Sequence, residues 1–385
     1  MKQKLNTAIV GAGFIGPIHL ENVRRTFEAN VTSLVGYTIE EAKEKAEQYS
    51  VPYYYDDIDK MLEDDSIDVV HICSPNYLHY EMAKKVLMAN KHCVCEKPLT
   101  LTPAEAKELT ELAREKNLVT AVHFNVRYYP LVRHAREMVK QGDVGKLLSV
   151  TGSYLQDWLL LETDYSWRLE SSVSGKTRAI GDIGSHWMDL TEYVSGLKIT
   201  EVFADFATFH KTRKKPKNPM ETWSSKILTN DDYQEVPVDT EDYASVLVHY
   251  NNGAQGVFTV NQMAAGHKNR VYYEINGTGA SLIWDSERPN EMMVGHREKG
   301  NEIIMKDPAL VYPEARELIS YPGGHNEGFA DTSKHLFKEV YDYILAGDYT
   351  EKPSFPTFLD GYREVILCES ICQSAESGQW VKVEE

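Results

Sequence analysis

The sequence predicts an α/β fold in two domains, the first built on a parallel sheet and the second on an open, mostly antiparallel sheet. Strands alternate with helices over residues 1–126, whereas longer strands with hairpin signals dominate residues 127–385. The length of 385 residues also exceeds the roughly 150 residues that one domain commonly holds. We therefore place one domain in residues 1–126 and the other in residues 127–385.

The first domain opens with an apolar strand at residues 7–10 and continues in strand–helix order. Further strands are predicted at 31–35, 67–73, 92–96 and 118–125, with helices at 15–29, 39–49 and 79–89. Thr102 and Glu105 form a capping box around Pro103, which marks the start of another helix. Strands that alternate with helices of this length predict a parallel sheet with right-handed crossovers.

The pattern changes near residue 127. After a helix at 130–140, turn signals at 251–253 and 277–279 separate pairs of alternating strands, which is typical of antiparallel hairpins. Long helices are predicted at 327–346 and 360–377. The basic run at 211–218 is interpreted as a solvated loop.

Charge and composition exclude several kinds of partner. The net charge of −17 disfavours nucleic acid and anionic membrane surfaces, because both are negatively charged. We find no apolar run of membrane-spanning length and no signal peptide. The five cysteines are an odd number without a zinc-binding pattern, so we expect a cytoplasmic protein with reduced cysteines and no metal site.

A glycine-rich motif follows the first strand directly. The residues expected to hold a dinucleotide there are Gly11, Gly13, Phe14, Ile15 and Gly16, in the pattern G-x-G-x-x-G. The first glycine permits a tight turn, the second lets the backbone approach a pyrophosphate, and the third lets the helix pack on the strand. The motif lies between a strand and a helix, as its function requires, and predicts a Rossmann domain.

The choice between NAD and NADP depends on the end of the second strand. An acidic residue there would bind the ribose hydroxyls, but this chain has Tyr37 and Thr38. Glu40 and Glu41 come later, on the predicted helix, and no arginine is present for a 2′-phosphate. We favour NAD and leave NADP open.

Three further segments carry polar residues to one region of the fold. Ser74, Pro75, Asn76 and His79 follow one strand, and Glu96 and Lys97 follow the next; all six are candidates for contact with the cofactor. These strand ends should lie at the carboxyl edge of the sheet. Asp182 and His186 are four residues apart on a predicted helix and should share one face.

Together these motifs resemble the family of glucose–fructose oxidoreductase and inositol 2-dehydrogenase. The resemblance rests on G-x-G-x-x-G, Ser-Pro-Asn-x-x-His, Glu-Lys-Pro and Gly-Asp-x-Gly-x-His-x-x-Asp in that order, and it extends through Asn125, Arg127, Trp167-Arg168 and residues 323–329. It implies an α/β second domain whose open sheet often mediates assembly, and hence a homodimer or homotetramer. It also implies Lys97, Asp182 and His186 as the catalytic set and an unusual peptide before Pro98, for which the cis form is a candidate.

The residue chemistry supports this set independently. Oxidation of an alcohol removes the hydroxyl proton as hydride leaves to the nicotinamide. His186 suits a general base, and Lys97 suits stabilisation of the developing alkoxide. Asp182 suits a neighbouring hydroxyl or the imidazolium. The predicted function is therefore hydride transfer between NAD(P) and a secondary hydroxyl of a sugar, glucoside, anhydrosugar or inositol. An NAD-dependent glycosidase and a non-catalytic dinucleotide-binding sensor are the alternatives.

The substrate is expected to be a neutral sugar or cyclitol, because no cluster for a phosphate group is evident. Aromatic faces beside polar groups suit a sugar ring. The residues predicted to bind substrate are Lys97, Arg127, Tyr154, Gln156, Trp158, Trp167, Arg168, Asp182, His186 and His325.

Overall fold

A computed structural model describes residues 4–217 and 232–384. The chain forms two compact units, the first made of Met1–Tyr129 and Glu327–Val365, the second of Pro130–Asn326 and Ile366–Glu385. These units are not identical to the two consecutive domains predicted from sequence, because residues 327–365 return to the first unit. The boundary after residue 126 stays a prediction about independently folding domains.

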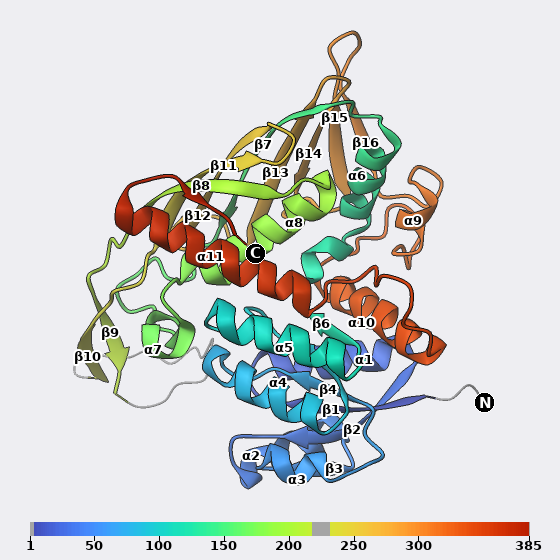
Figure 1. Cartoon of the computed structure of the whole chain (residues 1–385), viewed down its shortest axis with the longest axis vertical. Coiled ribbons are helices and arrows are strands. Elements are labelled where there is room, and N and C mark those ends of the chain that lie inside the picture. Colours follow the sequence, from blue (N-terminus) through green and yellow to red (C-terminus); the bar gives the residue numbers. More distant parts are fainter. Residues whose placement is uncertain (1–3, 218–231, 385) are drawn as a thin grey trace. The chain divides into compact units, whose positions relative to one another are not determined.

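The first unit contains a six-stranded parallel sheet (Figure 1), in the strand order β3-β2-β1-β4-β5-β6. Its strands are β1 (Leu5–Val10), β2 (Ala29–Val35), β3 (Tyr53–Tyr55), β4 (Val69–Ile72), β5 (His92–Cys95) and β6 (Thr120–Val122). All adjacent strands pair in parallel. This is the Rossmann order, and its direction reverses between β1 and β4, where such folds bind ligands at the carboxyl ends of the strands. The predicted parallel sheet is confirmed.

Helices connect these strands as the sequence predicts. They are α1 (Ile15–Thr26), α2 (Ile39–Tyr49), α3 (Ile58–Leu62), α4 (His79–Met88) and α5 (Pro103–Glu115). Thr102 and Glu105 form the predicted capping box of α5, with Pro103 in its first turn. The first unit also takes in α10 (Phe329–Ala346), which packs against α1.

The second unit contains a nine-stranded sheet in the order β16-β15-β14-β13-β7-β12-β11-β8-β17. Its strands are β7 (Leu147–Leu155), β8 (Ile199–Ala207), β11 (Tyr243–Tyr250), β12 (Gln255–Asn261), β13 (Arg270–Gly277), β14 (Ser281–Asp285), β15 (Glu291–Gly295), β16 (Glu302–Met305) and β17 (Val381–Lys382). Only β7 and β12 pair in parallel among these strands. The mostly antiparallel sheet and both hairpins are confirmed.

The helices of the second unit are α6 (Pro130–Gln141), α7 (Ser171–Ser174), α8 (Ser185–Ser195) and α9 (Pro313–Arg316). Helix α11 (Phe358–Ser377) has residues in both units. The buried Trp187 of α8 stacks on Phe258 of β12 and donates its indole N–H to the Tyr272 carbonyl oxygen, so α8 packs on one face of the sheet.

The helix predicted around Asp182 and His186 is present, and its first turn, Ile180–Gly184, is a π-helix that leads into α8. One expectation about the second unit is wrong. The basic run is not a loop: residues 212–216 form β9 (Thr212–Pro216), paired with β10 (Tyr233–Pro237). Asn218 lies outside the described residues.

None of the helices in residues 4–217 and 232–384 combines the length and the apolar character that crossing a bilayer requires.

Candidate active site

The glycine-rich turn has the geometry of a pyrophosphate cradle. Gly11 has a φ of +107°, and a Cβ on Gly16 would lie 1.9 Å from the Gly11 carbonyl oxygen. A Cβ on Gly13 would instead meet no atom within 4 Å. No side chain caps the N-terminus of α1. The turn is therefore tight where the helix packs and open at Gly13, where the backbone amides of Phe14 and Ile15 and the helix dipole can bind phosphate.

The end of β2 offers a different surface from the usual ribose site. Tyr37 is 92% exposed, and its backbone N–H donates to the carboxylate of Glu41. The Thr38 hydroxyl caps α2 by accepting from the Glu41 N–H. The acidic group near this position thus binds the protein backbone, and Tyr37 and Thr38 form the surface that would meet a ribose.

The turns after β4 and β5 are joined by His79. Its ring nitrogens lie 2.7 Å from the Pro98 carbonyl oxygen and 2.9 Å from that of Ser74. The peptide between Lys97 and Pro98 is cis. His79 is completely buried with both nitrogens against protein carbonyls, and it holds the turns with Ser74, Pro75, Asn76 and Lys97 together. A contact of His79 with the cofactor stays a prediction.

The Glu96 carboxylate is held by protein partners. The residue is 7% exposed, and its Oε1 lies 2.8 Å from His19 Nε2 and 2.6 Å from His123 Nδ1. Burial alone would raise the pKa of Glu96, but the charge of His123 and hydrogen bonds from His123 and His19 hold it well below its usual range. A contact of Glu96 with the cofactor stays a prediction.

The histidines around Glu96 form a chain with one consistent direction. Because a carboxylate only accepts, His19 donates at Nε2, and its neutral ring accepts at Nδ1 from His71 Nδ1, 2.9 Å away. His71 Nε2 then accepts from the Tyr341 hydroxyl at 2.7 Å. Burial and neighbouring His123 lower the pKa of His19 to about 4, which fits the neutral ring.

The same atoms of His19, Glu96 and His123 have the types that bind divalent metals. Their separations of 2.6 and 2.8 Å are those of hydrogen bonds, and the proton arrangement above accounts for each of them. This arrangement favours a hydrogen-bonded cluster over a metal centre.

Arg127 has a partner within the first unit. It is 8% exposed and its Nη2 lies 3.0 Å from Asp360 Oδ1. Burial alone would raise the pKa of Asp360, but the Arg127 charge holds it below its usual range. A contact of Arg127 with substrate stays a prediction.

In the second unit, the carboxylate of Asp182 lies between two donors. Arg168 Nε donates to its Oδ1 at 3.2 Å, and Gln262 Nε2 donates to its Oδ2 at 3.0 Å. His186 follows one turn later and is 8% exposed. The π-helical turn thus carries a carboxylate that is held by neighbouring side chains at both of its oxygens.

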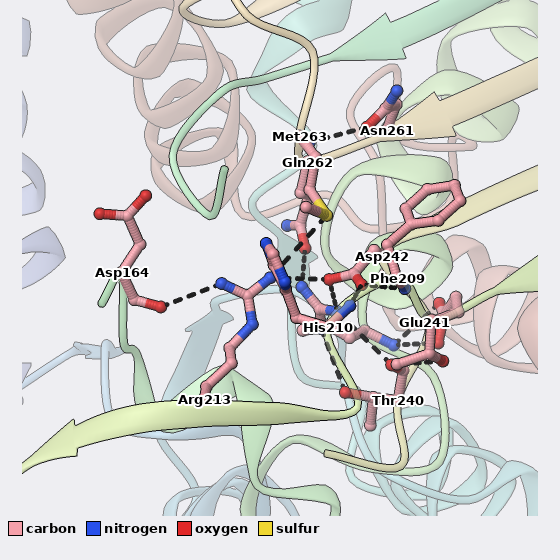
Figure 2. Close-up of polar contacts among 12 residues, drawn as sticks. Asp164, Phe209, His210, Arg213, Thr240, Glu241, Asp242, Asn261, Gln262 and Met263 are labelled. Atoms are coloured by element: carbon pink, nitrogen blue, oxygen red, sulfur yellow. Dashed lines mark hydrogen bonds and ion pairs between the residues drawn. The ribbon is translucent and has the colours of Figure 1, made fainter. Parts of the chain in front are cut away.

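Buried acidic groups hold the start of this helical segment. Glu241 is 3% exposed and accepts from the backbone N–H groups of Arg178 and Ile180, at 2.9 and 2.8 Å. Burial raises the pKa of Glu241, and these two N–H groups oppose the rise. Its neighbour Asp242 forms ion pairs with Arg178 and with Arg213, the second at 2.9 Å. Figure 2 shows Asp242 beside Arg213, whose guanidinium also donates to the backbone carbonyl oxygen of Asp164.

A second polar group lies near the end of β7. Asn269 Oδ1 accepts from the Tyr154 hydroxyl at 2.8 Å and from Gln156 Nε2 at 2.7 Å. Gln156 is 2% exposed, and its Oε1 has no hydrogen-bond partner among residues 4–217 and 232–384. The Tyr154 and His186 rings are 6.2 Å apart. Gln156 therefore presents a buried acceptor that a ligand hydroxyl would satisfy.

The remaining predicted substrate residues lie nearer the surface. Trp158 is 39% exposed, and the guanidinium of Arg168 lies 4.5 Å from the Trp167 ring centroid. His325 is exposed, and its carbonyl oxygen accepts from the buried Lys306 ammonium at 2.8 Å. Their contacts with a substrate stay predictions.

Sequence reasoning did not find Gln262, Arg178, Asp242 or Asn269. Each is a polar residue next to a strand or helix. Gln262, Arg178 and Asp242 are buried and Asn269 is half-buried, and only these positions in the fold distinguish them from surface residues. The buried His19, His71 and His123 were missed for the same reason. The only signal in the sequence is a histidine within an apolar stretch, and this signal does not predict which residue the histidine contacts.

Comparisons with known proteins match both parts of the chain. Residues 5–124 match the family described as "Oxidoreductase family, NAD-binding Rossmann fold", and residues 132–283 match "GFO/IDH/MocA C-terminal domain". Levoglucosan dehydrogenase of Pseudarthrobacter phenanthrenivorans is 30% identical, covering 99% of this chain and 98% of that protein. Myo-inositol 2-dehydrogenase of Thermotoga maritima is 26% identical, covering 99% of each. A solved structure titled levoglucosan dehydrogenase in complex with NADH and levoglucosan superposes with a TM-score of 0.88 at 29% identity, covering 100% of both chains.

Proposed function

The chain belongs to the GFO/IDH/MocA family of NAD-binding oxidoreductases, and from this premise we propose that it oxidises one secondary hydroxyl of a sugar, glucoside, anhydrosugar or inositol to a ketone. One observation carries the proposal. The Asp182 carboxylate is fixed by donors at both oxygens, one helical turn before His186, in a chain whose N-terminal turn is open to a pyrophosphate. An alcohol dehydrogenase needs polar side chains beside the hydroxyl that loses its proton, and it needs a site for the dinucleotide that accepts the hydride.

The residues present fit NAD. The amides of the Gly11–Gly16 turn would hold its pyrophosphate, Tyr37 and Thr38 would lie beside the adenosine ribose, and the turn at Ser74, Pro75 and Asn76 would border the nicotinamide side. Bound NAD supplies the hydride acceptor of the reaction. NAD is therefore the proposed cofactor. Its preference over NADP is measured by assays with both cofactors in parallel.

The proposed division of labour follows from the chemistry of each side chain. His186 takes the hydroxyl proton as general base, and the Lys97 ammonium stabilises the alkoxide charge that develops as the carbon loses hydride. Asp182 accepts a hydrogen bond from a neighbouring hydroxyl.

A neutral polyol is the proposed substrate class. Tyr154, Gln156 and Asn269 offer hydroxyl-binding groups, and the exposed Trp158 and half-buried Trp167 suit the C–H face of a sugar ring. We rank levoglucosan and myo-inositol first, because full-length relatives are named for them.

The test is NADH formation, measured at 340 nm with a panel of anhydrosugars, glucosides, free sugars and inositols, with NAD and NADP in parallel. We expect turnover with at least one neutral polyol and NAD, and its loss in Lys97→Ala and His186→Gln with NADH binding retained. Hydrolysis of an aryl glycoside without net NADH would instead indicate the NAD-dependent glycosidase. Binding of NADH without turnover of any compound would indicate the sensor.

We also propose a cytoplasmic homo-oligomer without nucleic-acid or membrane partners. All five cysteines are free, which suits a reducing compartment, and the net charge is −17. Leu247 and Val257 pair across β11 and β12 and are 45% and 38% exposed, which favours an assembly surface on the open sheet. Light scattering after gel filtration tests this; a monomer at micromolar concentration would contradict it.

A further inference from the structure

Gln262 connects the Asp182 carboxylate to a buried arginine. It follows β12 directly and is 2% exposed. Its Nε2 donates to Asp182 Oδ2 at 3.0 Å, and its Oε1 accepts from Arg178 Nη1 at 3.0 Å. One amide therefore bridges two groups of opposite charge.

The chemistry of the guanidinium fixes the direction of this bridge. An arginine only donates, so the amide oxygen of Gln262 must face Arg178 and its NH₂ group must face Asp182. The Asp182 oxygen that meets this NH₂ group must accept. Arg168 Nε donates to the other oxygen at 3.2 Å. A proton on Asp182 at either of these contacts would point at a donor, so the arrangement selects the ionised carboxylate.

Arg178 cannot turn to relax this constraint. Its guanidinium is fully buried and ion-paired with Asp242, and its Nε donates to the Thr240 hydroxyl at 3.1 Å. Asp242 is held in turn by Arg213 from β9 (Figure 2). The orientation of the Gln262 amide is therefore set by the charged cluster of Arg178, Asp242 and Arg213. The side chains of all three are fully buried.

We propose that Gln262 and Arg178 are positioning residues that keep Asp182 as an ionised hydrogen-bond acceptor. Asp182 then receives a hydrogen bond from a substrate hydroxyl or from an imidazolium and supplies no proton to the reaction. This deepens, and rests on, the proposed dehydrogenase function. It also narrows the substrate class: the substrate group beside Asp182 is a neutral hydroxyl, because a carboxylate or phosphate there would face a fixed negative charge.

The activity test uses two glutamine variants and one background variant, Asp182→Ala. Gln262→Met removes the donor at similar length and should lower kcat/KM by about 10- to 100-fold, mostly in kcat. In the Asp182→Ala background the same change should lower kcat/KM by less than about threefold further, because the hydrogen bond from Gln262 to Asp182 is already absent there. Gln255→Met makes the same replacement at an exposed position on β12 and should leave kcat/KM unchanged.

A stability test separates this inference from the proposed function, since it needs no turnover. Gln262→Glu keeps the acceptor for Arg178 but sets a second carboxylate against Asp182. It should lower the Tm followed by tryptophan fluorescence by about 3 °C or more, and Asp182→Asn in the same chain should restore most of that loss, because its amide donates to the new glutamate.

Two results would overturn the inference. A Gln262→Glu protein with wild-type Tm would mean that Asp182 carries a proton and donates there. Equal losses from Gln262→Met in the wild-type and Asp182→Ala backgrounds would mean that Gln262 acts independently of Asp182. A wild-type protein that turns over no polyol would contradict the proposed function, while the Tm comparison would still decide the state of Asp182.

Discussion

Acid should destabilise the first unit through its buried histidines, and His19 allows the size of the effect to be calculated. Its pKa falls from 6.5 to about 4 in the folded chain, because the ring is buried and lies beside His123. Below pH 6.5 the unfolded chain therefore binds a proton that the folded chain refuses. The stabilisation that His19 contributes is fully present above pH 6.5 and is lost as the pH falls toward 4.

The magnitude follows from the two pKa values. The full shift corresponds to roughly 3 kcal/mol, and between pH 7 and pH 5 the loss is roughly 2 kcal/mol for this one residue. His71 and His79 add to it in the same direction, since burial lowers the pKa of each. Glu96 adds at lower pH, because its pKa is held well below its ordinary value by the histidines.

The variant His19→Gln isolates the contribution. Glutamine still donates to Glu96 but lacks the buried ring that packs against Phe337, so the variant should be less stable than the wild type at pH 7. It binds no proton, so it lacks the loss of stability that His19 causes in acid. The difference in opening free energy should shrink by roughly 2 kcal/mol at pH 5. Tryptophan fluorescence does not follow this unit, because all six tryptophans lie outside Met1–Tyr129 and Glu327–Val365. Hydrogen exchange of peptides spanning α1 and β4 does.

His325→Gln is the matched control, because it removes an exposed histidine of the second unit. It should leave the exchange of α1 and β4 unchanged at both pH values. If wild type and His19→Gln differ by the same free energy at pH 7 and pH 5, His19 does not carry the proposed linkage, and the neutral, directed chain from Tyr341 to Glu96 is wrong.

Three further substitutions test separate parts of the fold. Gly16→Ala should abolish NADH binding in a fluorescence titration, because the new Cβ would lie 1.9 Å from the Gly11 carbonyl oxygen. Arg178→Met should lower the unfolding free energy of the second unit by roughly 3–5 kcal/mol in urea, because the buried Asp242 carboxylate loses a cation. Tyr37→Asp should raise the NAD-to-NADP ratio of kcat/KM by about tenfold or more, because a carboxylate there accepts from the ribose hydroxyls and repels a 2′-phosphate.

Each of the three substitutions has a matched control variant and a result that would refute the reasoning behind it. Gly300→Ala, whose Cβ would meet no atom within 4 Å, should bind NADH normally, and equal binding by Gly16→Ala would refute the tight turn. Arg297→Met removes an arginine whose side chain is 95% exposed, and equal losses from both arginine variants would refute the buried cluster. Tyr37→Asn lacks the new charge, and an unchanged cofactor ratio in Tyr37→Asp would remove Tyr37 from the ribose site.

The sequence predicts the first sheet well because its signals are local. A glycine turn between a strand and a helix, and a capping box at Thr102, fix where elements begin, and alternation with helices fixes the parallel direction. The return of residues 327–365 to the first unit has no local signal. It depends on long-range packing such as Phe337 against His19 and His71, which spacing along the chain does not encode.

In the candidate site, too, the residues with local sequence signals are predicted and those that depend on long-range packing are not. The motifs predict Lys97, Asp182 and His186 as the catalytic set. They give no information on which neighbouring residues hold those side chains. Glu96 and His79 look like site residues from their positions beside the motif turns, yet both side chains are buried against protein partners. Spacing assigns a residue to a turn, whereas the direction of its side chain depends on the donors and acceptors that the fold brings to it.

The most direct test of hydride transfer uses a substrate from the panel deuterated at its ring carbons. After turnover with NAD, nuclear magnetic resonance of the product cofactor should show one deuterium at nicotinamide C4, and Lys97→Ala and His186→Gln should form little of it. Reduced cofactor carrying only protium at C4 would mean that its hydrogen does not come from a substrate carbon, and would contradict the proposed reaction.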